Sequence, residues 1–206
     1  MELYLVRHGE TKWSRARRHT GRTDVPLSPA GEAEARALGA HLDGLEVDRV
    51  LASPLARATT TARLAGFGER LETTRALLEF DYGEYEGLTT PQIRAGRPGW
   101  DLFRDGCPGG ETVGAVAERA WRLVAELTDG DGRVMLFGHG HQLRILTTCY
   151  LGLPPDAARH LFLGTASVSV LGREHDWPAV LLWNEQEGSG APRHEAGVPG
   201  WRGISG

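Results

Sequence analysis

The chain has 206 residues, and its 23 lysine and arginine residues against 27 aspartate and glutamate residues give a formal net charge of −4 at pH 7. A chain of this length predicts one domain with a sizeable core, and the acidic balance argues against a general nucleic-acid binder, which needs a basic surface. Two cysteines are too few for a disulfide framework, and neither stands in a metal-binding spacing.

The first predicted elements are a buried strand and a helix. Residues 3–6 (Leu-Tyr-Leu-Val) form a continuous apolar run, which is typical of a strand buried on both faces of a parallel sheet. Farther along, Ser28 and Pro29 predict a helix start, because serine caps a helix and proline fits its first position. Leu38 and Leu42 then lie on one side of that helix.

The middle of the chain predicts a second strand and an amphipathic helix. Residues 50–52 form the strand, and Arg57 lies in the first turn of the helix that follows it. From Thr112 onward, apolar residues recur at helical spacing. They are Val113, Val116, Ala117, Ala120, Val124 and Leu127.

The last third of the chain repeats the alternation of strand and helix. Residues 134–137 predict a third strand, and a helix follows His141 and ends near Gly152, before two prolines that cannot continue it. Two later apolar runs, 168–171 and 180–183, predict further strands. Strands that alternate with helices predict an α/β fold, with a three-layer, open, mostly parallel sheet and helices on both faces.

Two segments lack this periodicity. Residues 79–110 are rich in glycine, proline and charged residues, and an irregular stretch of this size is typical of a functional insertion or lid. Residues 185–206 contain many glycines and no apolar period, which predicts a flexible C-terminal tail. We therefore expect a single domain over residues 1–184, with the insertion inside it.

Polar residues follow the first three predicted strands. Arg7 and His8 follow the first strand, His139 follows the third, and Arg57 lies just after the second. Ligands of open α/β sheets bind outside the carboxyl ends of the strands, so these side chains should meet at one edge. Guanidinium groups bind phosphate oxygens in pairs. The pattern therefore predicts a site for phosphate.

Histidine and carboxyl groups in such a site can catalyse a reaction. One imidazole can act as a nucleophile, and the other, protonated beside the dianion, can stabilise charge on the transferring oxygens. A leaving alkoxide also needs a proton, for which Glu79 and Asp81 are the candidates. We favour Glu79, although the pattern alone does not separate the two.

Other interpretations of these residues stay open. His139 and His141 could form a metal-binding pair, since imidazoles suit zinc, but no cysteine or carboxylate cluster lies near them in the sequence. His141 could instead face the pocket or cap a helix. His19 has no partner pattern and is expected to be a surface or structural residue, whereas Trp13 is a candidate substrate contact.

Residues 5–11 (Leu-Val-Arg-His-Gly-Glu-Thr) resemble the signature of the histidine phosphatase superfamily, in its phosphoglycerate mutase-like branch. The resemblance covers nearly all of the chain except the tail, and its segments stand in the family's order. The further segments that carry it are 20–28, 53–58, 78–79, 82–83, 86–87, 110–112 and 139–140.

This resemblance implies a phosphoglycerate mutase-like fold and a phosphohistidine mechanism without metal or cofactor. It implies that His8 attacks phosphorus, Glu79 protonates the departing oxygen, and His139 helps to hold the phosphoryl group. Because His139 must then be protonated, we expect better activity at mildly acidic pH than at pH 9. The other implied phosphate-binding residues are Arg7, Arg57, Ser14, Thr20, Gly21 and Gly140, and the candidate substrate pocket consists of Trp13, Tyr82 and His141.

Within the family, the sequence is more similar to phosphatases than to glycolytic mutases. Residues 105–111 and the pair 140–141 resemble sedoheptulose-bisphosphatase-like enzymes and small actinobacterial acid phosphatases. A mutase needs a long basic lid to retain its bisphosphate intermediate. The charged residues after Gly87 are Arg94, Arg97, Asp101, Arg104 and Asp105, which make a weak clamp for a second anion. We therefore favour a phosphomonoester hydrolase, with a cofactor-dependent phosphoglycerate mutase as the alternative.

The remaining expectations concern partners and location. The substrate should be a small phosphorylated metabolite, with neither nucleic acid nor membrane as a partner. The late apolar runs fit either a homodimer edge or the core. No basic segment followed by a long apolar run opens the sequence, and no stretch approaches the ~20 apolar residues of a membrane span, so we expect a cytoplasmic protein. A metal-dependent hydrolase and a non-catalytic phosphoryl-binding module are the other functions considered.

Overall fold

The computed structural model describes residues 1–186, in which six strands form one sheet in the order β3-β2-β4-β1-β5-β6. Strands β3, β2, β4 and β1 run parallel, whereas β5 is antiparallel to β1 and β6 to β5. This sheet confirms the mostly parallel α/β prediction. The strands are β1 (Glu2–Arg7), β2 (Arg49–Ala52), β3 (Leu71–Thr73), β4 (Arg133–Gly138), β5 (Val168–Glu174) and β6 (Trp177–Glu185).

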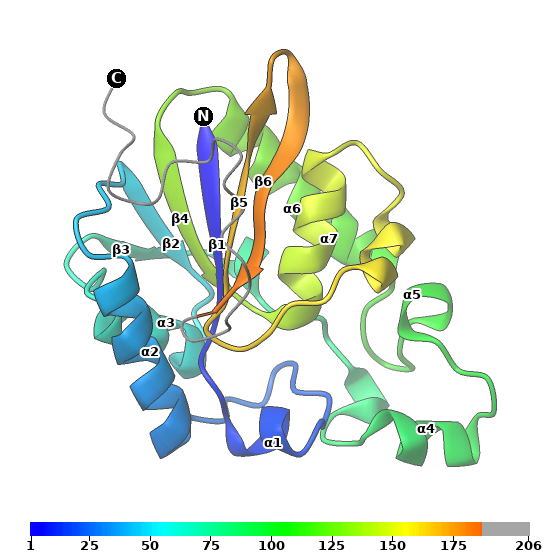
Figure 1. Cartoon of the computed structure of the whole chain (residues 1–206). Coiled ribbons are helices and arrows are strands. Elements are labelled where there is room, and N and C mark those ends of the chain that lie inside the picture. Colours follow the sequence, from blue (N-terminus) through cyan, green and yellow to red (C-terminus); the bar gives the residue numbers. More distant parts are fainter. Residues whose placement is uncertain (187–206) are drawn as a thin grey trace.

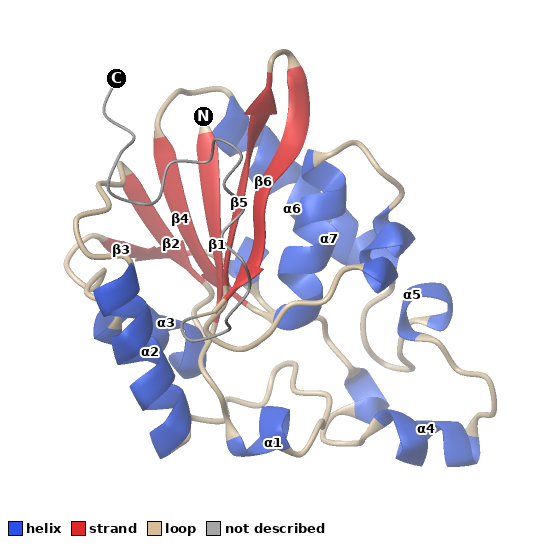
Figure 2. Cartoon of the chain, in the orientation of Figure 1, coloured by secondary structure: helices blue, strands red, loops and turns tan. Residues whose placement is uncertain are grey.

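Helices cover both faces of the sheet, as Figure 2 shows. Helices α2 and α3 pack together on one face, and α6 and α7 pack together on the other. The α-helices are α1 (Lys12–Arg15), α2 (Pro29–His41), α3 (Ala56–Leu64), α4 (Thr90–Gly96), α5 (Leu102–Asp105), α6 (Val113–Thr128) and α7 (Gly140–Tyr150). Three 3₁₀ turns are η1 (Arg75–Leu77), η2 (Gly83–Tyr85) and η3 (Pro155–His160).

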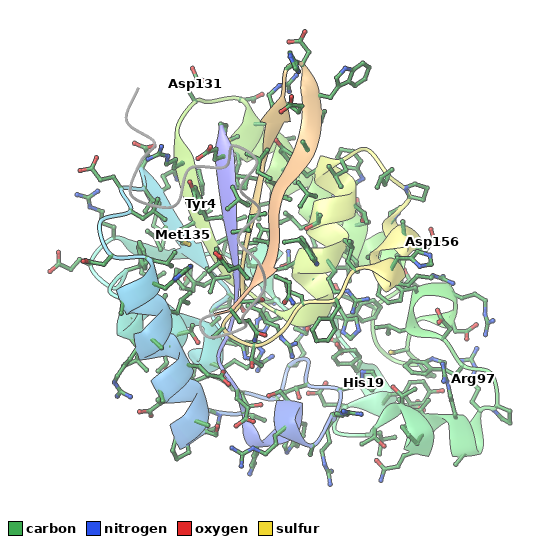
Figure 3. The ribbon with its side chains drawn as sticks, in the orientation of Figure 1. Tyr4, His19, Arg97, Asp131, Met135 and Asp156 are labelled. Carbon is green, nitrogen blue, oxygen red and sulfur yellow. The ribbon has the colours of Figure 1, made fainter. Side chains whose placement is uncertain are left out.

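The continuous apolar run of β1 reflects burial on both faces. Leu3 and Leu5 belong to the core cluster beneath α6 and α7, whereas Tyr4 and Val6 belong to the cluster beneath α2 and α3. Successive side chains of a strand point to opposite faces, so an unbroken run is needed where both faces are covered. Met135 of β4 joins the same cluster as Tyr4, and Figure 3 labels both side chains.

The sheet places the sequence-predicted polar residues at one end of the molecule. In Figure 1, β1 runs from the N-terminus toward the end of the sheet where α1 and α4 lie. Because β1, β2 and β4 are parallel neighbours, their carboxyl ends converge there. Ser28 caps α2 as expected, by accepting a hydrogen bond from the amide of Gly31, and Thr112 caps α6 by accepting one from the amide of Ala115.

The insertion and the C-terminal segment differ in detail from expectation. Residues 79–110 are not wholly irregular, because they include η2, α4 and α5, which are too short to show a full apolar period. Strand β6 includes Glu185, so it extends one residue into the predicted tail, and residues 187–206 of that tail lie outside the described residues. Within residues 1–186, no helix is long and apolar enough to cross a membrane.

Candidate active site

His8 lies directly after β1 and presents one free ring nitrogen. Its backbone N–H donates to Gly138 O of β4 over 3.0 Å, which extends the parallel ladder past the strand end. Its Nδ1 lies 2.7 Å from Gly9 O. A carbonyl oxygen only accepts, so Nδ1 carries the proton and Nε2 keeps its lone pair. Nε2 has no hydrogen-bond partner within residues 1–186, which suits it to attack a substrate.

His139 is held between Arg57 and Ser53. The Arg57 Nε donates to His139 Nδ1 over 3.2 Å, and His139 Nε2 lies 2.8 Å from Ser53 Oγ. Arginine nitrogens only donate, so the ring proton is on Nε2 and His139 is neutral in this arrangement. Its ring lies edge-on to that of His8, with 5.1 Å between the ring centroids.

The buried Arg57 side chain also fixes the loop of residues 20–23. Its Nη1 donates to Thr23 O, and its Nη2 donates to Thr20 O and Gly21 O, over 2.9 to 3.1 Å. On the other side of this loop, the Glu86 carboxylate accepts from the backbone N–H groups of Gly21 and Thr23. The loop is therefore bound by a cation through its carbonyls and by an anion through its amides.

Arg7 provides a buried donor that no protein group uses. Its Nη1 donates to Leu163 O over 2.6 Å, but its Nε is buried without a partner in the described part of the chain. An unsatisfied buried donor costs about 1–3 kcal/mol, which a bound oxyanion would relieve. The Nε group faces Gly140, where a Cβ atom would lie 3.4 Å away. The glycine keeps the approach to the guanidinium open.

The structure separates the two candidate proton donors. Glu79 Oε1 accepts from the backbone N–H groups of Phe80 and Gln142, and Oε2 accepts from His141 N–H at 3.2 Å. Glu79 thus lies at the N-terminus of α7, beside His139 and Gly140. Asp81 instead pairs with Arg22 over 3.2 Å and accepts from Gly83 N–H.

Burial and positive charge keep the two site histidines neutral without ligand. Desolvation lowers the pKa of His8 and His139 well below 6.5, and the nearby Arg57 and Arg7 lower both further. His139 was expected to be protonated beside a bound dianion, and that expectation stays a prediction. In the site without ligand, the Arg57 Nε–His139 Nδ1 contact favours the neutral ring. The activity optimum at mildly acidic pH stays a prediction.

The side chains expected to bind phosphate from the first loop are engaged elsewhere. Ser14 Oγ completes a capping box at the start of α1, accepting from Thr11 N–H and donating to Thr11 O. Thr20 Oγ1 donates to Arg18 O. The N–H of Gly21 is taken by Glu86. In the unliganded site these three groups bind other parts of the protein, so they stabilise the loops around the site.

The candidate substrate pocket is partly assembled. Tyr82 Oη lies 2.7 Å from His141 Nδ1. Trp13 packs against the backbone at Gly87, where an added Cβ atom would lie 3.0 Å from the Trp13 ring. His19, expected to be a surface or structural residue, packs against Tyr82 with 4.8 Å between the ring centroids. Figure 3 labels His19 on the side of the molecule that carries α4 and α5.

The arrangement leaves the proposed histidine metal pair with few free nitrogens. Both ring nitrogens of His139 have hydrogen-bond partners, and Nδ1 of His141 is bonded to Tyr82. Within residues 1–186, no three histidine, cysteine, aspartate or glutamate side chains are grouped so that they could hold a metal ion.

Sequence reasoning assigned no role to several residues that the structure places at the site. Ser53 holds His139, and Thr61 accepts from Gly9 N–H over 3.0 Å next to His8. Glu86 holds the 20–23 loop, and Arg144 lies beside Phe103 near His141. Ser53 and Glu86 fall within the family-like segments, which was the one available signal. Thr61 and Arg144 have none.

Known proteins resemble this chain in sequence and in fold. A family model described as "Histidine phosphatase superfamily (branch 1)" matches residues 3–186. An acid phosphatase of Mycobacterium tuberculosis is 45% identical over 177 residues, which cover 84% of this chain and 87% of the relative. A sedoheptulose 1,7-bisphosphatase of Saccharomyces cerevisiae is 32% identical, with 72% of this chain and 67% of the relative covered.

Two further similarities extend the comparison. A probable phosphoglycerate mutase of Salmonella choleraesuis is 33% identical, with 87% of this chain and 88% of the relative covered. The solved structure of a Mycobacterium tuberculosis open reading frame superposes with a TM-score of 0.86 at 40% identity, covering 90% of this chain and 97% of that chain. The names of these relatives include both a phosphatase and a phosphoglycerate mutase, the two activities that the sequence motifs indicated.

Proposed function

Because the chain belongs to the histidine phosphatase superfamily (branch 1), we propose that it hydrolyses small phosphomonoesters through a phosphohistidine formed on His8. Two relatives of the chain are named as phosphatases of this kind, an acid phosphatase and a sedoheptulose 1,7-bisphosphatase, which supports phosphomonoester hydrolysis. The proposal assigns the chemical steps to this chain's own residues.

In the first step, His8 Nε2 attacks phosphorus. The N–P bond forms as the ester P–O bond breaks, and Glu79 gives its proton to the departing oxygen, which leaves as an alcohol. Arg7 holds the phosphoryl oxygens, and the buried Arg57, whose donors bind His139 and the 20–23 loop, offsets their charge. An oxygen of the bound dianion accepts a hydrogen bond from Arg7 Nε, which has no acceptor in residues 1–186.

In the second step, water attacks the phosphorus of the phosphohistidine. The water gives a proton to the Glu79 carboxylate, the N–P bond breaks, and its electron pair returns to His8 Nε2. Inorganic phosphate leaves, and both residues regain their starting states. The position of Glu79 at the start of α7, next to His139 and Gly140, supports its action in both steps.

The observation that carries the proposal is the state of the His8 ring. Gly9 O fixes the proton on Nδ1, and Nε2 has an available lone pair next to the guanidinium groups of Arg7 and Arg57. Such a ring is prepared for attack on an anionic phosphorus centre without first losing a proton.

The test is phosphate release from p-nitrophenyl phosphate by wild type and His8→Ala. We expect activity to fall at least about a thousandfold in the variant, because no other nucleophile occupies the strand end. Acid-quenched wild type, mixed with ³²P-labelled substrate, should contain an acid-labile phosphoryl group that is absent from His8→Ala. Undiminished turnover in the variant would refute the proposal.

The alternative is a cofactor-dependent phosphoglycerate mutase, as one relative's name indicates. The charges of the insertion favour hydrolysis instead. Arg97 and Arg104 both pair with Asp105, and Arg94 Nε donates to Trp100 O. Few cations therefore remain in this segment to retain a second anionic group. A coupled assay for interconversion of 2- and 3-phosphoglycerate, run beside phosphate release, distinguishes the two activities.

A further inference from the structure

His141 lies next to the residue that we propose as the proton donor. It is the second residue of α7, directly after Gly140, and its backbone N–H donates to the Glu79 carboxylate. Glu79 contacts the leaving oxygen in the proposed reaction. The His141 ring also lies near enough to Arg7 for that guanidinium to lower its pKa, so the ring is on the same side of the site as the proposed phosphate-binding groups.

Tyr82 fixes the orientation and the tautomer of the His141 ring. The Tyr82 hydroxyl is buried, and its hydrogen-bond partner in the described part of the chain is His141 Nδ1, at 2.7 Å. A buried hydroxyl needs an acceptor, so Tyr82 donates and Nδ1 accepts. The proton of the neutral His141 ring is then on Nε2. Burial and the nearby Arg144 and His19 lower the pKa of His141 well below 6.5, so the ring stays neutral.

The Nε2–H group of His141 is a free donor. It has no hydrogen-bond partner within residues 1–186, and it is not among the buried polar atoms that lack partners. Those atoms are Arg7 Nε, Arg22 Nη1 and Gln142 Oε1. The Nε2–H group is therefore accessible from the open side of the ring, on the opposite edge from Tyr82.

Aromatic side chains lie near the His141 ring. The His141 ring centroid lies 5.7 Å from that of Phe103 and 6.1 Å from that of His19. Burial lowers the pKa of His19 to about 4, so this second imidazole is also neutral near pH 7. The nearby cation, Arg144, lies over Phe103 and donates through Nε and Nη2 to Ala158 O.

We propose that His141 is a specificity-determining residue, whose Nε2–H donates to a hydroxyl oxygen of the leaving group in polyhydroxylated phosphomonoesters such as monosaccharide phosphates. The faces of aromatic rings pack well on the C–H groups of a sugar, and a neutral N–H suits a hydroxyl better than a second dianion. This inference rests on the proposed phosphatase function and names the substrate class of the same site.

The test compares two substrates that differ in the leaving group. Ribose 5-phosphate has hydroxyl groups for His141 to bind, whereas the leaving group of p-nitrophenyl phosphate has none. In His141→Phe, which keeps an aromatic ring, the ratio of kcat/KM for ribose 5-phosphate to that for p-nitrophenyl phosphate should fall about tenfold, mainly through KM. His160→Phe, at an exposed histidine on η3, should leave this ratio unchanged.

A second variant tests the orientation of the ring. Tyr82→Phe removes the hydroxyl that fixes Nδ1 and should lower the same ratio by a few fold, whereas Tyr82→His, which returns a donor, should restore part of it. An unchanged ratio in His141→Phe overturns the proposal, as does failure of wild type to hydrolyse ribose 5-phosphate while it hydrolyses p-nitrophenyl phosphate. Failure on both substrates would instead contradict the phosphatase function itself.

Discussion

Single side chains hold the proposed phosphate-binding groups in place. Arg57 contacts the carbonyls of the 20–23 loop and the ring of His139, so one buried guanidinium sets the position of two parts of the site. Glu86 completes the arrangement by accepting from Gly21 and Thr23. Hydrogen bonds to charged groups contribute about 1.5–3 kcal/mol each, roughly twice a neutral bond.

Glu86→Ala should lower kcat/KM for p-nitrophenyl phosphate by about 10- to 100-fold, because the 20–23 loop loses its carboxylate acceptor and Arg57 loses a fixed partner. Glu86→Gln, which keeps one acceptor oxygen, should recover part of the loss. Glu84→Ala is the matched control, since Glu84 is an exposed residue of the same segment whose carboxylate has no bond in residues 1–186. Steady-state kinetics decide, and an equal loss in both variants would contradict the role of Glu86.

The backbone that follows His8 and the first turn of α2 approach each other at two glycines, Gly9 and Gly31. A Cβ atom on Gly9 would lie 2.4 Å from Gly31 O, and one on Gly31 would lie 2.0 Å from Glu10 O. Ser28, the N-cap of α2, also donates both its N–H and its hydroxyl to Glu10. The first turn of α2 therefore supports the backbone that follows His8.

Gly31→Ala should lower the free energy of unfolding by about 1–3 kcal/mol, because the added methyl group meets backbone that cannot move without shifting the His8 loop. Helix propensity alone predicts the opposite sign, a gain of up to about 1 kcal/mol. Gly114→Ala in α6 is the control, since its Cβ atom would meet only Thr112 Oγ1 at 3.7 Å. Urea denaturation measures both, and a stabilised Gly31→Ala would exclude the steric contact.

The longer helices and five of the six strands in residues 1–186 could be predicted from the sequence, whereas the short elements β3, α1, α4 and α5 could not. Strand β1 was recognisable from residues 3–6, whereas β3 has no buried residue and spans Leu71–Thr73 alone. Parallel pairing of predicted strands brought His8, Arg57 and His139 together correctly. The contact between Arg57 and His139 joins residues 82 positions apart, and that between Gly21 and Glu86 joins residues 65 apart. Local patterns carry no information on such pairs.

Four histidines near the site are neutral in the folded protein at pH 7. Burial is the largest cause of the lowered pKa of His8, His19, His139 and His141. In the unfolded chain each would titrate near 6.5. Below that pH the unfolded state binds more protons than the folded state, so stability must fall as the solution becomes more acidic.

The contribution of these histidines to the free energy of unfolding should therefore be roughly constant above pH 7. The free energy of unfolding should decrease as the pH falls from 6.5 toward 4.5. Each buried histidine contributes up to about 1.4 kcal/mol per pH unit in this window. Urea midpoints at pH 7, 6 and 5 measure the slope. His19→Gln should make it shallower, and His175→Gln, at an exposed histidine, should not. A slope that His19→Gln leaves unaltered would contradict the titration.

The ion pairs inside the insertion have a consequence for how enzymes of this type diverge. Asp105 pairs with Arg97 and Arg104, and Trp100 Nε1 donates to Gly106 O, so residues 97–106 satisfy much of their polarity among themselves. Trp100 and Leu102 of this segment are buried in the core cluster beneath α6 and α7, so an exchanged segment must keep these two packing residues. Grafting this stretch between relatives offers a direct route to new substrate preferences on an unchanged reaction centre.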